Sequence, residues 1–369
     1  MDKGKEVLKR RIATARRHLN DKKIHCLILT KPANVTYLTG FSGEDSWAVI
    51  TRRTLHLLTD SRYTEQAEGE CRGCKIIQRD GPIAAATAKL TEKFKSVRTV
   101  HVEASASLSD FEALKKRVKV RLKPAAQVIE AVRLNKDSSE ISAIRSAARI
   151  ANRALGRVLR CIKPGITESE LAGALDFEIH KLGARNSFET IVAFGPNASR
   201  PHHQPGRRKL KNNDSILIDF GARYNGYCSD LTRCFAVGRP SAYYKKVYEA
   251  VRQAQAAAIE MVSPGVDVLQ VDQAARSVIR NAGLPVYGHG TGHGLGLEIH
   301  EGPVVSKEGK GKLKAGMVLT IEPGVYIPGR LGVRIEDDIL VTENGFKILS
   351  RDSADEVKLA ALSRTRRRN

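Results

Sequence analysis

The spacing of apolar and polar residues over the first 125 positions predicts an α/β unit. Short apolar runs between turn residues predict buried strands at 25–30, 46–51, 54–60 and 99–104. Helical character marks 64–70 and 83–97, and Ser109 precedes an acidic turn that would begin a further helix. The first 19 residues could form a basic amphipathic helix, which we interpret as the ordinary first helix of this unit.

Beyond residue 135 the apolar spacing becomes that of longer helices, and an internal repeat is visible. Residues 138–159 carry apolar side chains at helical intervals. Segments beginning at Cys161 and Met261 match at an offset of 100 residues, at Pro164/Pro264, Gly165/Gly265, Ala174/Ala274, Ile179/Ile279 and Gly183/Gly283. Two copies are too few for a solenoid. We therefore expect a duplicated half-domain with a pseudo-twofold axis and a ligand cleft between its halves.

Length and composition set the broad class of the protein. The 369 residues are enough for two domains, and a hydrophobic content of 41% allows a substantial core. No apolar run approaches the length of a membrane span, and the N-terminus lacks the apolar segment of a secretory signal. Six cysteines are a low density that favours a reducing compartment, so we expect a cytoplasmic protein. Cys71 and Cys74 form a C-x-x-C pair, but no second pair or nearby histidine completes a zinc set.

The formal net charge of +22 raises the question of a polyanionic partner. Lysine and arginine are spread along the whole chain, and their one tight cluster is the tail, with Arg364, Arg366, Arg367 and Arg368. Aromatic residues make up only 5% of the chain, and no nucleic-acid-binding motif is present. We interpret the charge as a general surface property and expect neither a nucleic acid nor a membrane partner.

Four carboxylates interrupt apolar, strand-like runs in the second half of the chain. Asp219 and Asp230 are 11 residues apart on either side of a turn-rich segment, which fits facing strands of a hairpin. Glu322 and Glu336 lie in two later runs of the same kind. Each one alone could be a turn or surface residue. A carboxylate in an apolar strand is costly unless it is paired or bound to a metal, so the four together favour a metal site.

The stretch "HGTGHGLGLEIHE", residues 289–301, supplies histidines near these acids. Its glycines at 290, 292, 294 and 296 argue against the helix of a zinc-protease motif and predict a loop that enters a strand at "GLGLEIHE". One histidine with four carboxylates suits Mn²⁺, Co²⁺ or Zn²⁺ and can hold two ions. Such a pair can activate water and polarise a carbonyl, while the remaining histidines could stabilise a tetrahedral intermediate.

The motifs "IDFG", "SDLTR", "HGTGHGLGLEIHE", "TIEPGVYI" and "VRIED" occur in the order found in one family. Residues 135–350 resemble the pita-bread (M24) metallopeptidases, which include Xaa-Pro aminopeptidase (aminopeptidase P), prolidase and methionine aminopeptidase. Through "TKPANVTYLTGFSG" and "LLTDSRYTEQA", the first half resembles the creatinase-type N-terminal domain. The resemblance implies an α/β N-terminal domain (1–128), a duplicated α+β pita-bread catalytic domain (129–358) and a basic tail (359–369).

The resemblance implies a role for each matching residue. Two divalent ions, most simply Mn²⁺ with Co²⁺ or Zn²⁺ as alternatives, would be held by Asp219, Asp230, His293, Glu322 and Glu336. Glu322 would also accept a proton from the attacking water. The other catalytic residues would be His202 on the proline side, His289 near the substrate, His300 at the reacting carbonyl and Arg334 behind the metal ligands.

Two assignments stay open. His203 is the alternative to His202, which the spacing to Asp219 favours. In the N-terminal domain, Asp60, Arg62 and Tyr63 either line a neighbouring subunit's cleft or form a structural turn.

The implied activity is dinuclear metal-dependent hydrolysis of the N-terminal Xaa-Pro bond of short peptides by a homodimeric aminopeptidase. Prolidase, which accepts dipeptides, shares every motif and is the nearest alternative. A creatinase-like hydrolase and a non-enzymatic module that binds peptides or nucleic acid are further alternatives. Both fit less well, because all five ligand positions are present.

Overall fold

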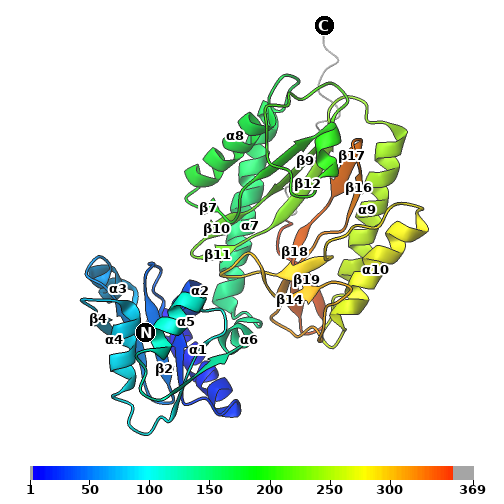
Figure 1. The fold of residues 1–369 in the computed structure, drawn as a ribbon. Coiled ribbons are helices and arrows are strands. Elements are labelled where there is room, and N and C mark those ends of the chain that lie inside the picture. Colours follow the sequence, from blue (N-terminus) through cyan, green and yellow to red (C-terminus); the bar gives the residue numbers. More distant parts are fainter. Residues whose placement is uncertain (1–2, 352–369) are drawn as a thin grey trace. The chain divides into compact units, whose positions relative to one another are not determined.

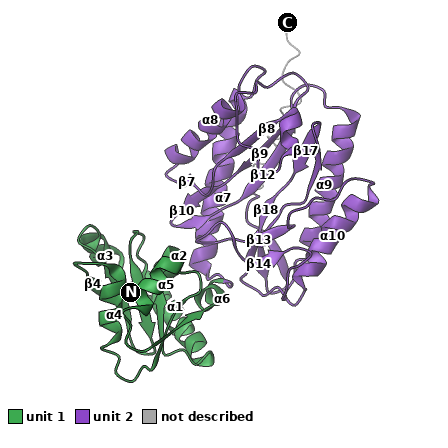
Figure 2. Cartoon of the chain, viewed as in Figure 1, with its two compact units in different colours: residues 1–133 green, residues 134–369 purple. Residues whose placement is uncertain are grey.

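The computed structural model describes residues 3–351 of the chain. The chain forms two compact units, residues 1–133 and 134–369 (Figure 2). The division falls after helix α6 (Ile129–Arg133), whereas the sequence placed it after residue 128, because α6 packs against helices of the first unit. The predicted basic tail, 359–369, lies outside the described residues.

The first unit is built on one mixed six-stranded sheet. Its strand order is β4-β3-β2-β1-β5-β6, and β1 pairs antiparallel with β2 but parallel with β5. The strands are β1 (Cys26–Leu29), β2 (Trp47–Thr51), β3 (Leu55–Thr59), β4 (Lys75–Gln78), β5 (Thr99–Glu103) and β6 (Arg121–Ala125). The four predicted strands are present as β1, β2, β3 and β5. The apolar runs did not indicate β4 and β6, which are short, half-exposed strands at the two sheet edges.

Five further helices accompany α6 around this sheet (Figure 1). They are α1 (Lys3–Asp21), α2 (Pro32–Thr39), α3 (Thr64–Glu70), α4 (Ile83–Thr91) and α5 (Leu108–Lys115). The basic first helix buries Ile12 and Leu19, which are spaced as an amphipathic helix requires, and it also buries Ala15. The cap prediction at Ser109 is wrong by two residues. Ser107 is the N-cap and accepts a hydrogen bond from the Asp110 backbone N–H, so Ser109 lies inside the helix.

The second unit contains the predicted duplication. Helices α8 (Glu168–Lys181) and α10 (Val268–Asn281) have the same length and begin 100 residues apart. Each begins with a capping box, from Thr167 in the first copy and Asp267 in the second. The preceding turns form equivalent backbone hydrogen bonds, from Gly165 N to Leu210 O and from Gly265 N to Leu313 O. A long helix precedes each copy, α7 (Ser138–Val158) and α9 (Ala242–Glu260).

Antiparallel strands lie between the two helix pairs (Figure 1). One sheet has the order β12-β9-β8, and a second has the order β14-β13-β15-β18-β19. Strands β16 and β17 form a hairpin, and β11, β10 and β7 form a small sheet. Their bounds are β7 (Arg185–Asn186), β8 (Ile191–Phe194), β9 (Ser215–Phe220), β10 (Ala222–Tyr224), β11 (Tyr227–Cys228), β12 (Leu231–Ala236), β13 (Gly292–Gly294), β14 (Glu301–Val305), β15 (Val318–Ile321), β16 (Gly324–Ile327), β17 (Leu331–Arg334), β18 (Asp337–Thr342) and β19 (Gly345–Ile348).

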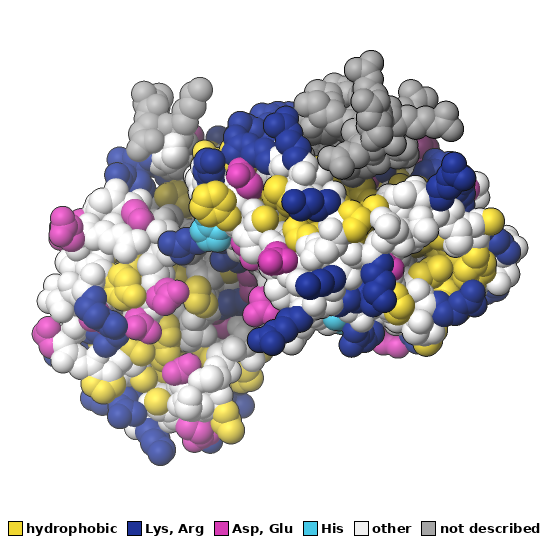
Figure 3. Space-filling model, turned by 90° about the horizontal axis from the view of Figure 1, so that it is seen from above, with side chains coloured by type: hydrophobic (Ala, Val, Ile, Leu, Met, Phe, Trp, Pro, Cys, Tyr) yellow, Lys and Arg dark blue, Asp and Glu magenta, His cyan; other side chains and the backbone are white. Residues whose placement is uncertain are grey.

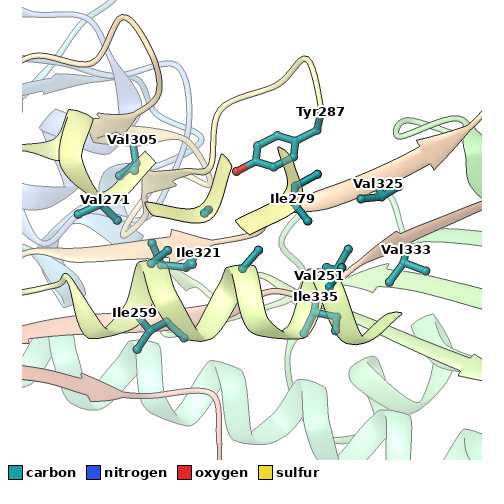
Figure 4. Packing of buried hydrophobic residues seen from close by; sticks show 14 of the residues in the cluster. Val251, Ile259, Val271, Ile279, Tyr287, Val305, Ile321, Val325, Val333 and Ile335 are labelled. Carbon is teal, nitrogen blue, oxygen red and sulfur yellow. The ribbon is translucent and has the colours of Figure 1, made fainter. Parts of the chain in front are cut away.

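The core of the second unit fixes the strands that carry polar side chains. Helix α9 packs against α10 and against β15, β16 and β17. Figure 4 shows the close packing of Val251, Ile259, Ile321, Val325 and Ile335 between these elements. Burying a side chain of this kind contributes roughly 1.5–3 kcal/mol. The ends of β15, β17 and β18 are therefore held rigidly.

The distribution of charged side chains on the surface can be compared with the formal net charge of +22. On the face seen in Figure 3, lysine and arginine side chains recur across the surface, with acidic side chains between them. Among the described residues, no helix has the length and apolar character needed to cross a membrane.

Candidate metal centre and active site

The first two predicted ligands come from one antiparallel strand pair. Asp219 lies in β9 opposite Thr232 of β12, and Asp230 directly precedes β12. The small strands β10 and β11 fill the turn-rich segment between them. The predicted hairpin is thus present, and it brings two carboxylates that are 8% and 5% exposed to the end of one sheet.

The second copy repeats this arrangement. Glu322 directly follows β15, and Glu336 directly precedes β18, which pairs antiparallel with β15. The backbone N–H of Glu336 donates to the carbonyl of Thr232, at 3.2 Å, so the two copies join at this point. The duplication therefore provides two carboxylates from each half, and they meet between the halves.

His293 enters the cluster on the short strand β13, and the glycines beside it are sterically required. A Cβ on Gly292 would lie 1.9 Å from the carbonyl oxygen of Thr320, and one on Gly294 would lie 1.8 Å from that of Gly302. The predicted strand at "GLGLEIHE" is wrong. The register shifts between His293 and Gly294, and the chain bends through residues 295–300 before β14 begins at Glu301.

These five side chains line one cavity, and three of them lie close enough to share an ion. The imidazole Nε2 of His293 lies 3.5 Å from Asp230 Oδ2 and 3.6 Å from Glu322 Oε1. Ligand atoms of Asp230, His293 and Glu336 all lie within 4.8 Å of one another. All five side chains line one cavity of about 620 Å³ in the second unit.

Burial and crowding shift the pKa values of these groups. Burial, reinforced by the neighbouring carboxylates, raises the pKa values of Asp230 and Glu336 well above the ordinary range. Burial also raises the pKa of Glu322 to about 8. Burial lowers the pKa of His293 to about 4, which keeps the imidazole neutral. In the protein alone, therefore, His293 supplies no positive charge to the carboxylates around it.

The donor set fits divalent metal ions. His293 Nδ1 contacts the carbonyl oxygen of Gly294 at 3.0 Å and must donate to it, which leaves Nε2 as a bare acceptor facing the carboxylates. Asp219 Oδ1 is buried and has no hydrogen-bond partner among the described residues. A buried carboxylate oxygen without a donor and a neutral imidazole are ligands that suit Mn²⁺, Co²⁺ or Zn²⁺.

Arg334 forms the wall behind these ligands. Its Nη2 pairs with Asp219 Oδ2 at 2.5 Å, its Nε donates to Thr232 Oγ1 at 3.1 Å, and its Nη1 donates to Tyr326 OH at 2.8 Å. Thr232 in turn donates to Glu336 Oε2 at 2.7 Å. Arg334 thus positions ligands from both copies.

His289 is connected to the same network. Its Nε2 lies 2.9 Å from Tyr326 OH, and its Nδ1 lies 2.7 Å from the carbonyl of Gly290. Arg276 donates to the backbone carbonyls of Tyr287 and His289, and it pairs with Asp272 at 2.7 Å. Burial lowers the pKa of His289 to about 4, so this histidine is also neutral.

The other predicted histidines, His202 and His300, also line the cavity, as does the alternative His203. The ring of His300 packs edge-on against the ring of His293, with ring centroids 4.4 Å apart. His202 is exposed in the cavity wall, whereas His203 is buried and its Nε2 lies 2.9 Å from Glu168 Oε2. The structure therefore leaves His202 facing the cavity, while the imidazole of His203 is engaged by a buried carboxylate.

In the first unit, Asp60 and Arg62 form a turn stabilised by their own side chains. Arg62 Nε donates to Asp60 Oδ1 at 3.0 Å, and Arg79 Nη2 pairs with Asp60 Oδ2 at 2.8 Å. These contacts favour the structural interpretation of this segment. Cys71 and Cys74 are both free thiols in this structure.

Sequence inspection missed the residues that orient the site, namely Glu168, Thr232, Asp272, Arg276 and Tyr326. Tyr326 lies within the motif "TIEPGVYI" and Thr232 within "SDLTR", so both could have been considered. The other three lie on helices, where a single charged residue is unremarkable in sequence.

Comparisons with known proteins agree with this geometry. Residues 142–343 match the model of metallopeptidase family M24, and residues 11–135 match the creatinase/prolidase N-terminal domain. An uncharacterized peptidase of Bacillus subtilis is 39% identical over 90% of this chain and 95% of its own length.

Two solved structures are similar over nearly their whole length. An Xaa-Pro dipeptidase from Bacillus anthracis superposes with a TM-score of 0.90 at 35% identity, over 94% of this chain and 98% of that one. An X-Pro aminopeptidase from Thermotoga maritima superposes with a TM-score of 0.84 at 34% identity, over 91% and 98%. The chain is therefore a member of metallopeptidase family M24, with a pita-bread catalytic domain that follows a creatinase-type N-terminal domain.

Proposed function

We propose that this protein is an Xaa-Pro dipeptidase that releases the residue preceding proline. One observation carries the proposal: Asp219, Asp230, His293, Glu322 and Glu336 line a single cavity together with further histidines. The likeness to the Bacillus anthracis dipeptidase, over 98% of that chain, supports the choice of dipeptides.

The five clustered side chains would hold two divalent ions. We propose Mn²⁺ rather than Co²⁺ or Zn²⁺, because oxygen ligands outnumber the single imidazole. When bound, such a pair supplies Lewis acidity for the scissile carbonyl and lowers the pKa of a water into the neutral range. Glu322 would take the proton from the attacking water, since one of its oxygens faces His293 and the other faces His289.

The remaining cavity residues would bind and orient the peptide. An Xaa-Pro bond has no N–H at the proline, so the site has to recognise the ring and the groups around it. His202 would contact the proline side, and His300, next to His293, would stabilise charge on the reacting carbonyl oxygen. Arg334 would hold Asp219, and Tyr326 would hold His289, in fixed positions.

An Xaa-Pro aminopeptidase that accepts longer peptides is a second candidate, and one feature of the cavity favours it. Among the described residues that line the cavity, Arg334 is the one Lys or Arg, and it is already paired with Asp219. A dipeptide would bring a free carboxylate next to the proline, where residues 134–351 offer it histidines rather than an uncommitted cation. A peptide that continues beyond proline would place a neutral amide there.

Kinetics on matched peptides distinguish these candidates. We would measure kcat/KM for Ala-Pro, Ala-Pro-Ala and Ala-Ala with Mn²⁺, Co²⁺ and Zn²⁺ added separately. A dipeptidase should favour Ala-Pro at least tenfold over Ala-Pro-Ala, whereas an aminopeptidase should accept both. Lack of hydrolysis of either proline peptide with every metal would refute the proposal. The proposed homodimer would be tested by light scattering.

A further inference from the structure

The segment from Phe194 to Gly206 carries His202 and is anchored on both sides of it. On one side, Arg334 donates from Nη1 and Nη2 to the carbonyl of Pro201, at 3.3 and 3.4 Å. On the other side, His203 Nε2 lies 2.9 Å from Glu168 Oε2. His202 itself is exposed in the cavity wall, so its position depends on how its two neighbours are held.

Glu168 is fully buried, and it uses both carboxylate oxygens on this one segment. Its Oε1 accepts hydrogen bonds from Phe194 N and Asn197 Nδ2, both at 2.8 Å. Its Oε2 is bonded to His203 at 2.9 Å and accepts from Gly206 N at 3.1 Å. All four partners lie between residues 194 and 206, so this carboxylate ties together the segment on which His202 sits.

The helix that bears Glu168 adds backbone contacts to the same segment. Ser169, the second residue of α8, donates from its backbone N to Gly206 O at 3.1 Å. Its Oγ donates to Pro205 O at 3.0 Å. The end of the segment is therefore fixed to a rigid element, and the carboxylate extends this attachment back toward Phe194.

The second copy of the repeat shows that the helix does not need this carboxylate. Helix α10 begins at Val268, the position equivalent to Glu168, and Val268 is fully buried. Both helices begin with the same capping box, so an apolar side chain suffices at that place in the fold. A buried carboxylate is costly without its partners, which indicates that Glu168 serves the segment rather than the helix.

We propose that Glu168 is a positioning residue that acts through His203 to hold His202 against the substrate. This inference rests on the proposed function, because it takes His202 as a substrate-contacting group. It also accounts for the different settings of two adjacent histidines: His203 lies inward on the carboxylate, and His202 faces the cavity.

The first test replaces His203 in two ways. His203→Phe keeps an aromatic ring but removes the donor to Glu168, whereas His203→Gln retains an amide N–H that can reach it. We expect kcat/KM for Ala-Pro to fall about 10–100-fold in His203→Phe, because a small misplacement of a substrate-contacting group can cost about 100-fold in rate. His203→Gln should recover to within about threefold of the parent protein, and both variants should bind as much metal as the parent, because Glu168 contacts none of the five ligands. Equal losses in both variants would overturn the inference.

The second test is a double-mutant cycle with His202→Ala. If Glu168 and His203 act through His202, then His202→Ala/His203→Phe should be no slower than His202→Ala alone. If His203→Phe does not fold, the isosteric Glu168→Gln takes its place in the same cycle with His202→Ala. Additive losses, or full activity of His202→Ala, would refute the positioning role while leaving Xaa-Pro hydrolysis intact. An inactive parent protein would instead refute the proposed function.

Discussion

Arg334 and Asp219 form a buried ion pair in the cavity wall, with side chains that are 4% and 12% exposed. The pair joins β17 to β9 and so connects a strand of one half of the duplicated domain to a strand of the other. Asp219 Oδ2 is thereby fixed, while Oδ1 has no partner among the described residues and faces the site. The second unit thus directs one carboxylate oxygen at the proposed metal site and immobilises the other.

Replacing Arg334 tests this arrangement. Arg334→Lys keeps the positive charge but loses the planar guanidinium that donates to four residues in fixed directions, so we expect metal affinity and kcat/KM to fall about 10–100-fold. Arg334→Ala leaves Asp219 buried without its partner and should destabilise the protein by about 3–5 kcal/mol. Metal titration, steady-state kinetics and urea unfolding measure these effects. Arg330→Lys, on the loop before β17, is the matched control and should behave like the parent protein. Unchanged metal affinity in Arg334→Lys would contradict the proposed role.

Tyr326 connects Arg334 to His289 through one hydroxyl group. Tyr326→Phe removes that hydroxyl and preserves the ring. We expect kcat to fall about tenfold, because His289 loses the donor to its Nε2, while metal content is unchanged. Tyr243→Phe, on the outer helix α9, is the control and should retain full kcat. Equal kcat values in the two variants would show that the hydroxyl does not orient His289.

The glycines of β13 make a steric prediction. Gly294→Ala places a Cβ against the carbonyl of Gly302, which is backbone and cannot move alone. We expect a loss of about 1–3 kcal/mol in stability and weaker metal binding, since β13 and β14 must separate around His293. Gly173→Ala, in helix α8 with open space around its Cβ, should be neutral or slightly stabilising. Thermal unfolding of both variants provides the comparison, and a Gly294→Ala variant as stable as Gly173→Ala would contradict it.

The buried acids predict how pH affects the metal-free protein. The pKa of Glu322 is about 8 in the folded chain, above its ordinary value of 4.5, so between these values the folded state binds a proton that the unfolded state has released. The contribution of this group to stability is therefore full below about pH 4.5 and is lost as the pH rises toward 8. Asp230 and Glu336 shift in the same direction.

Bound cations should remove this cost by favouring the ionised carboxylates. We expect the difference in Tm between Mn²⁺-loaded and EDTA-treated protein to widen steadily from pH 5 to pH 8. Comparing the two forms at each pH cancels the titration of groups outside the site, which is common to both. A difference that stays constant over this range would contradict the assignment of these acids to the metal site.

The sequence could predict that the carboxylates gather in one place, because several carboxylates within apolar strands are costly unless a cation neutralises them. The separation of Asp219 and Asp230 predicts facing strands, and the β9–β12 pairing agrees. The repeat likewise predicts α8 and α10, since equivalent turns precede both helices.

The sequence could not predict the residues that orient the site, because their partners are distant along the chain. Glu168 meets His203 across 35 positions, and Asp272 meets Thr291 across 19. Local pattern carries no information on such pairings. The bend at residues 295–300 could not be predicted either, because it depends on contacts with distant parts of the chain. The glycines at 292 and 294 are required by the backbone carbonyls of Thr320 and Gly302, which approach them only in the folded unit.

Metal content measured together with activity tests the central claim most directly. The purified chain and its Asp230→Ala variant would be stripped with a chelator, titrated calorimetrically with Mn²⁺ and assayed on Ala-Pro at each addition. We predict that the parent protein binds two equivalents per chain and gains activity as they bind, whereas Asp230→Ala neither binds them nor becomes active. Full activity of the stripped parent, or of Asp230→Ala, would contradict the account.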